Sequence, residues 1–115
     1  MAEQIASVKI DKLNGTNYAS WKYNVQLVLM QQGLWGIANG TEDRPDIKEE
    51  DKNKDENVKL IKAWQLRCDK AYSIIALNVE KSLQVCVTGT TDAKEAWKIL
   101  KDQFEITTVP HVVYV

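Results

Sequence analysis

Apolar side chains recur every three or four positions between residues 58 and 79, in the run VKLIKAWQLRCDKAYSIIALNV. This period places them on one face of a helix of about six turns. The stripe comprises Ile61, Trp64 or Gln65, Cys68, Tyr72, Ile75 and Val79, and it is widened by Leu60, Ala71 and Ile74. So wide a stripe predicts a central helix that packs on more than one side. The opposite face is predicted to be solvated, and it carries Lys59, Lys62, Arg67 and Lys70.

A second helical segment begins at an aromatic pair, Tyr18 and Trp21, whose spacing of three residues puts both rings on one face. Thr16 or Asn17 precedes the pair as a candidate N-cap, because a short side-chain oxygen can accept a hydrogen bond from a free backbone N–H of the first turn. Gly33 can end the helix by adopting a positive φ. We therefore predict a helix between this cap and this glycine.

A third helix is predicted to begin at Thr91 or Asp92. Asp92 with Glu95 three residues later matches a capping box in which an acid is the cap. The apolar face of this helix comprises Ala93, Ala96, Trp97, Leu100 and Phe104. Two short apolar stretches, residues 34–37 and 82–87, each predict a single helical turn, although a strand stays open for residues 82–87.

Together these segments predict an all-α fold, a small helical bundle of three main helices plus one or two short ones. A chain of 115 residues forms one domain. We divide it into an extended lead-in over residues 1–15, a helical domain over residues 16–105 and a β-prone tail over residues 106–115. The predicted core comprises Trp21, Val25, Leu29, Cys68, Tyr72, Ile75, Trp97, Leu100 and Phe104.

Acidic residues gather in residues 42–57 (EDRPDIKEEDKNKDEN), which hold eight acids against four bases. This stretch predicts a solvated loop whose end forms the first turn of the next helix. The rest of the chain holds eight acids and eleven bases, and this small positive excess is too weak to argue for phosphate contacts. Two Asn-Gly-Thr tripeptides, residues 14–16 and 39–41, predict turns because Asn-Gly is a strong turn dipeptide.

Residues that carry out catalysis or bind metals are sparse. The single histidine, His111, has no carboxylate beside it, and neither Cys68 nor Cys86 has a partner at a zinc-ligand spacing. We expect no catalytic residue, no metal, no cofactor and no enzymatic activity. The cysteines are expected to be reduced in a cytoplasmic protein, with a disulfide between them left open. No apolar run approaches the roughly 20 residues that cross a membrane, so we expect no membrane partner.

The order of these segments resembles the N-terminal part of Gag from copia-type LTR retrotransposons. The resemblance covers roughly residues 9–105. It rests on two runs, LNGTNYASWKYNVQLVLMQQGLWGIANGT and AWQLRCDKAYSIIALNVEKSLQVCVTGTTDAKEAWKILKDQFE, which flank the acidic stretch. The residues that match the family pattern are Leu13, Gly15, Asn17, Tyr18, Trp21, Leu34, Trp35, Trp64, Asp69, Ala71, Thr91, Ala93, Lys94, Glu95, Ala96, Trp97, Leu100 and Phe104.

The resemblance implies a capsid-like lobe with a role in assembly. Gag proteins of this kind form shells around the RNA of the element, using a two-lobed helical capsid and a downstream zinc knuckle. The expected partner is therefore a second copy of this chain or a full-length Gag. RNA contact is expected to be weak, or to depend on downstream regions that this sequence does not contain. Because the tail departs from the helical pattern, a fragment, a truncated element and a domesticated host gene all stay open.

Tyr18 and Trp21 admit two interpretations. We expect them to anchor the first helix in the core, with Trp97 as a partner. The alternative is a small single-stranded RNA-binding module that stacks bases on Tyr18, Trp21 and Trp35. That module would need basic residues interleaved with the aromatic ones, and only Lys22 is close.

No pattern marks a protein interface directly. The exposed positions that we expect to contribute are Gln26 and Met30 on the first helix, and Lys59, Lys62 and Arg67 on the central helix. In the tail, β-branched residues around Pro110 predict an edge strand. Its partner would be residues 7–13 or the tail of a second copy, the latter involving Val112 and Val113. An unordered end is the third alternative.

Overall fold

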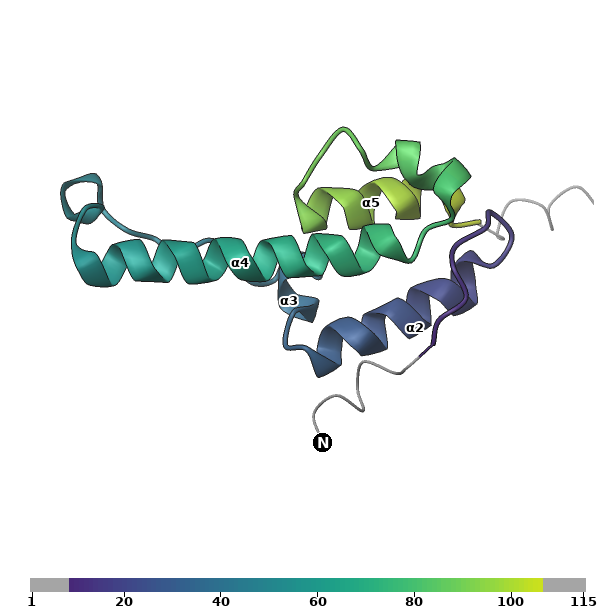
Figure 1. Ribbon diagram of the computed structural model, residues 1–115, viewed down its shortest axis with the longest axis horizontal. Helices are drawn as coiled ribbons and strands as arrows, with labels where there is room; N and C mark the ends of the chain where they lie inside the picture. Colours follow the sequence, from purple (N-terminus) through teal and green to yellow (C-terminus); the bar gives the residue numbers. More distant parts are fainter. Residues whose placement is uncertain (1–8, 107–115) are drawn as a thin grey trace, which may run out of the picture.

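The computed structural model describes residues 9–106, and every regular element among them is helical (Figure 1). The elements are α2 (Tyr18–Gln31), α3 (Trp35–Asn39), the 3-10 turn η1 (Glu49–Asp51), α4 (Asp55–Leu77), the 3-10 segment η2 (Lys81–Cys86) and α5 (Ala93–Phe104). The predicted all-α bundle of three main helices and shorter ones is therefore confirmed. In this part of the chain no helix is long and apolar enough to cross a membrane.

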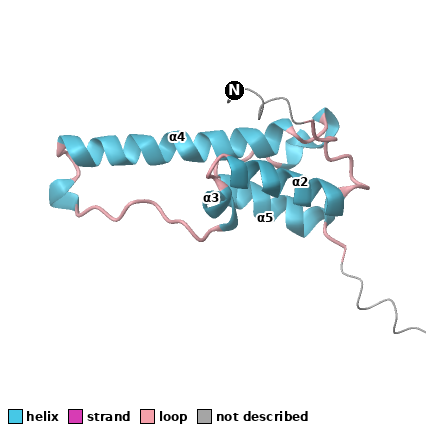
Figure 2. Cartoon of the chain, turned by 90° about the horizontal axis from the view of Figure 1, so that it is seen from below, coloured by secondary structure: helices cyan, strands magenta, loops and turns pink. Residues whose placement is uncertain are grey.

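Helix α4 is the axis of the bundle. Helices α5, α3 and α2 all pack against it, and α3 also contacts α2 and α5. They gather on the C-terminal half of α4, so that its N-terminal half extends beyond them (Figures 1 and 2). The loop that carries η1 runs outward along this extended half, from α3 to the start of α4. The acidic stretch thus forms the predicted loop, and its last three residues form the first turn of α4.

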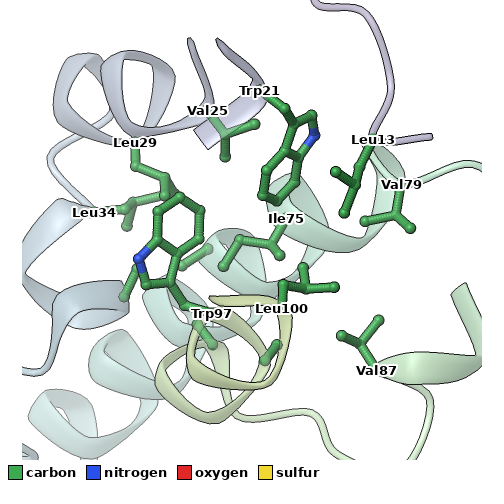
Figure 3. Close-up of a cluster of buried hydrophobic side chains, with 14 of the residues drawn as sticks. Leu13, Trp21, Val25, Leu29, Leu34, Ile75, Val79, Val87, Trp97 and Leu100 are labelled. Carbon is green, nitrogen blue, oxygen red and sulfur yellow. The ribbon is translucent and has the colours of Figure 1, made fainter. Parts of the chain in front are cut away.

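The core lies where α2, α4 and α5 meet (Figure 3). Six of the predicted core residues are buried there, namely Trp21, Val25, Leu29, Ile75, Trp97 and Leu100. The prediction of full burial was wrong for Cys68, Tyr72 and Phe104, which pack against the core but are only partly buried. These three lie at its rim: Phe104 ends α5, and the Tyr72 hydroxyl donates to the Val87 carbonyl at 2.7 Å.

The lead-in contributes one residue, Leu13, to the core and forms one backbone bridge to the end of α4. Leu13 is fully buried and forms an isolated parallel bridge with Val79. The Leu13 N–H donates to the Asn78 carbonyl at 2.8 Å, and the Glu80 N–H donates to the Leu13 carbonyl at 3.0 Å. Within residues 9–15, this bridge is the lead-in's link to the end of α4. The hydrogen bonds fix the start of α2 beside the end of α4.

Helix α2 ends at the predicted glycine, but it begins without the predicted side-chain cap. Gly33 ends the helix with φ +72°, as predicted. Asn17 is the N-cap residue, but its side chain makes no capping hydrogen bond. The Asn17 Oδ1 instead accepts from the Asn14 N–H at 2.9 Å, and its Nδ2 donates to the Lys12 carbonyl at 3.0 Å. This side chain therefore holds the lead-in turn rather than the helix.

At the start of α5 the predicted Asp92 cap forms, but the reciprocal capping-box hydrogen bond from Glu95 does not. Asp92 Oδ1 accepts from the Lys94 N–H at 2.9 Å. The Asp92 N–H, which a capping box would pair with Glu95, donates to the Thr90 hydroxyl oxygen at 3.0 Å. The capping-box prediction is wrong because a nearer side chain has taken this donor.

Candidate interaction surfaces

Four aromatic rings from three helices meet inside the bundle. The Trp21 ring of α2 stacks on the Trp97 ring of α5, with 5.7 Å between centroids. Trp35 of α3 meets Trp97 edge-on at 5.4 Å, and Tyr18 lies 5.9 Å from Trp21. Figure 3 shows the indoles of Trp21 and Trp97 around Ile75 of α4. Such offset and edge-on pairs stabilise packing beyond area burial, so the cluster ties α2, α3 and α5 together.

Two polar groups of this cluster, on Trp21 and Tyr18, lie in defined surroundings. The Trp21 indole N–H donates to the Asn78 carbonyl at 2.7 Å. Burial, together with the nearby carboxylates of Glu105 and Asp102, raises the pKa of the Tyr18 hydroxyl to about 12. Tyr18 and Trp21 are 7% and 1% exposed. The prediction that the pair anchors α2 in the core is confirmed.

The stacking platform considered for Tyr18, Trp21 and Trp35 does not form. Base stacking needs an open ring face. The faces of Trp21 are covered by its neighbours, and Trp35 is only partly exposed because its ring packs against Trp97. The aromatic residues at the mouth of α2 therefore serve packing.

Arg67 of α4 joins three elements instead of lying on a solvated face. Its guanidinium donates to both carboxylate oxygens of Glu42, and its Nη2 donates to the Gly33 carbonyl at 2.7 Å. Glu42 follows α3 and Gly33 follows α2. The hydrogen bonds lower the pKa of the Glu42 carboxyl. Placing Arg67 on the solvated face was wrong, because a guanidinium pairs with a carboxylate through two parallel hydrogen bonds.

Lys59 and Lys62 lie where α4 extends beyond the bundle, and both are exposed (Figure 2). The neighbouring Leu60 is 52% exposed. Its prediction as part of the packed stripe was wrong, since the helices that would cover it do not reach this half of α4. The loop that carries η1 is joined to α4 by a hydrogen bond from the Asn57 side-chain amide to the Asp51 carbonyl at 2.9 Å.

Gln26 and Met30 lie one turn apart on α2, and the Gln26 amide donates to the Met30 sulfur at 3.8 Å. Met30 is 52% exposed and Gln26 is partly exposed. Tyr23 and Leu27 are also exposed, at 61% and 40%. Sequence reasoning missed these two residues, although the spacing of Tyr23, Leu27 and Met30 by four and three positions is a helical signal.

A cleft of about 460 Å³ lies between the start of α2 and the end of α5. Its charged groups pair with one another: the Lys22 ammonium lies 3.1 Å from the Glu105 carboxylate and 5.9 Å from the centroid of the Tyr18 ring. No group in this cleft is left with an unpaired charge to direct a charged ligand. The cleft therefore offers little beyond an apolar surface.

Chemically reactive groups do not converge between residues 9 and 106. No three His, Cys, Asp or Glu side chains in this range could hold a metal ion. Cys68 and Cys86 are both free and partly buried. Burial raises the pKa of the Cys68 thiol, which makes it a poor nucleophile. His111, Val112 and Val113, and the tail pairing considered for them, lie outside the described residues.

A family model described as the gag-polypeptide of LTR copia-type matches residues 25–115 of this chain. The chain belongs to the copia-type Gag family. The resemblance drawn from the two sequence runs is thereby confirmed. The match begins within α2 of this Gag domain, includes α3, α4 and α5, and continues through the last residue. No curated protein and no solved structure matches this Gag chain.

Proposed function

We propose that this chain is a structural assembly module, a Gag-type lobe that associates with itself or with a full-length Gag in cytoplasmic retrotransposon particles. The observation that carries the proposal is the copia-type Gag match over residues 25–115. The packed helical bundle supports it, because a rigid helical unit can present fixed surfaces to a neighbour. No catalytic role is part of the proposal.

A single-stranded RNA-binding module is the second candidate, and it has less support. The burial of Trp21 counts against it, since stacking needs an open ring face. Lys22, a basic side chain that lies over the Tyr18 ring, is paired with the Glu105 carboxylate. We therefore favour protein contact.

The test is sedimentation velocity of the full chain over a wide concentration range, alone and mixed with an intact copia-type Gag. We expect the sedimentation coefficient to rise with concentration, or the chain to sediment with the larger Gag. An unrelated helical protein of similar mass, mixed with the same Gag, is the control. A strictly monomeric chain that does not sediment with Gag would contradict the proposal.

A further inference from the structure

Helix α2 is apolar on two opposite sides. Its inner side carries Tyr18, Trp21, Val25 and Leu29. Its outer side carries Tyr23, Leu27 and Met30, which form a stripe because they are spaced four and three residues apart. Lys9 and Ile10 of the lead-in lie beside this outer stripe, along a cleft of about 200 Å³ that Leu27 also lines. Figure 1 shows α2 at the edge of the bundle.

The outer stripe is uncharged, although 27% of the residues in the chain are charged. Lys22 is the one charged residue of α2, and its ammonium contacts Glu105 beyond the end of α5. The polar residues of α2 beside the stripe include the amides Asn24, Gln26 and Gln31, and Lys9 of the lead-in is the charged residue that lines the adjoining cleft. By contrast, the exposed side of α5 carries Lys94, Glu95, Lys98, Lys101 and Asp102. Few charges, with tyrosine and methionine, are typical of the centre of a protein interface.

We propose that the outer stripe of α2 pairs with the same stripe of a second copy, with the helices antiparallel about a two-fold axis near Leu27. The inference rests on the proposed assembly function and names its surface and its partner. In a two-fold contact each residue near the axis meets its own copy. A charged residue there would repel itself, whereas an uncharged stripe does not.

The order of residues along the stripe fits this pairing. With Leu27 at the axis, Tyr23 of one copy lies near Met30 of the other, and methionine sulfur packs well against an aromatic ring. Antiparallel helix dipoles also attract each other. RNA is a poorer occupant, since phosphate contacts need lysine or arginine and the stripe has neither.

The size of the contact sets the strength that we expect. Helix α2 has 14 residues, which makes it about 21 Å long. One face of such a helix is smaller than the roughly 800 Å² per partner of a stable dimer. We therefore expect a dissociation constant on the order of 100 μM. Repetition of the contact in a particle would strengthen it through avidity.

The experiment compares single charges placed on and off the stripe. Met30→Glu and Leu27→Glu are the stripe variants, and Leu60→Glu on α4 is the matched control, because Leu60 and Met30 are both 52% exposed. Sedimentation velocity of full chains is run from about 5 μM to about 1 mM, which brackets the expected dissociation constant. We expect association in the wild type and in Leu60→Glu, and at least about a tenfold loss in both stripe variants. Circular dichroism confirms that each variant is folded.

A charge swap tests the two-fold arrangement itself. Leu27→Glu and Leu27→Lys should each fail to associate alone, since like charges meet at the axis. Mixed in equal amounts, they should associate, because opposite charges then face each other. A mixture that stays monomeric would contradict pairing at Leu27.

Other outcomes would overturn the inference and leave the assembly function standing. One is undiminished association of Leu27→Glu and Met30→Glu; another is a wild type that binds intact Gag but not itself. A drop in melting temperature of Leu27→Glu without any change in mass would mean that the chain covers its own stripe, and would also overturn the inference. A wild type that associates with nothing would contradict the inference and the proposed function together.

Discussion

At the scale of single residues, Trp97 joins three helices through one ring, since it contacts Trp21 of α2 and Trp35 of α3 from its place on α5. It is 9% exposed, so Trp97→Ala would remove both contacts and leave a cavity. We expect the free energy of unfolding in a urea titration to fall by about 3–5 kcal/mol.

Leu66→Ala is the control, at a residue that is 61% exposed on α4. It should change the free energy of unfolding by less than about 0.5 kcal/mol. A loss below about 1 kcal/mol for Trp97→Ala would show that this ring contributes little to the core.

Tyr18 makes the stability of the chain depend on alkaline pH. Its pKa of about 12 in the folded chain lies above the value of about 10 for an unfolded tyrosine. The folded state thus binds the proton more tightly, so this contribution is complete below pH ~10 and is lost as the pH rises to about 12. Because solvent screens part of this effect, the loss is smaller than the roughly 3 kcal/mol that two pKa units would give. Urea titrations across this range should show a shallower decline for Tyr18→Phe, and equal declines would contradict the assignment.

At the scale of elements, the contact between Arg67 and Glu42 ties α4 to the ends of α2 and α3. The two side chains are 37% and 41% exposed, so solvent screens their attraction. We expect Glu42→Gln to cost about 1 kcal/mol of unfolding free energy rather than several. Since the pKa of Glu42 is lowered in the folded chain, the contribution is present above the unfolded value of about 4.3 and is lost as the pH falls through the folded value.

A double-mutant cycle with Glu42→Gln and Arg67→Lys measures this contact. Lysine keeps the charge but cannot bond both carboxylate oxygens and the Gly33 carbonyl at once. The matched control is the Lys98–Asp102 pair on α5, which is 74% and 61% exposed and should couple more weakly, because solvent screens an exposed pair. Equal coupling in the two pairs would show that Arg67 does not join the elements.

The ends of these helices show what short-range sequence rules can predict. Gly33 and Asp92 were located correctly because a positive φ and a side-chain cap each involve only adjacent residues. Asn17 was located correctly but its role was not, since its amide bonds the preceding turn. The spacing of apolar residues likewise predicted α2, α4 and α5, because helical period is a local property.

At the scale of the whole molecule, the remaining errors concern contacts between distant residues. Leu13 pairs with Val79, and Arg67 pairs with Glu42, and no local period indicates either partner. Leu60 and Ile75 were both predicted to belong to the apolar side of α4. Leu60 lies beyond the bundle and is 52% exposed, whereas Ile75 lies at its centre and is fully buried. Periodicity indicates which side of a helix can be buried, but the lengths and positions of the neighbouring helices decide how much of it is covered.

The charge distribution of the whole chain predicts weak binding to single-stranded RNA. The net charge is −1, and five lysine or arginine side chains are paired with carboxylates within residues 9–106. The extended half of α4, which carries Lys59 and Lys62, is accompanied by the acidic loop (Figure 2). Phosphate binding gains its strength from free cations that release counterions.

Fluorescence anisotropy with a labelled single-stranded RNA is the measurement. At physiological salt we expect a dissociation constant weaker than about 100 μM, at the weak end of non-specific binding. Glu49→Lys combined with Glu50→Lys is the comparison variant, since it changes the charge of residues 42–57 from eight acids against four bases to six against six without touching the core. It should bind RNA more tightly and with a steeper dependence on salt than the natural chain. Sub-micromolar binding by the natural chain, weakening steeply with salt, would favour the RNA-binding alternative over protein assembly.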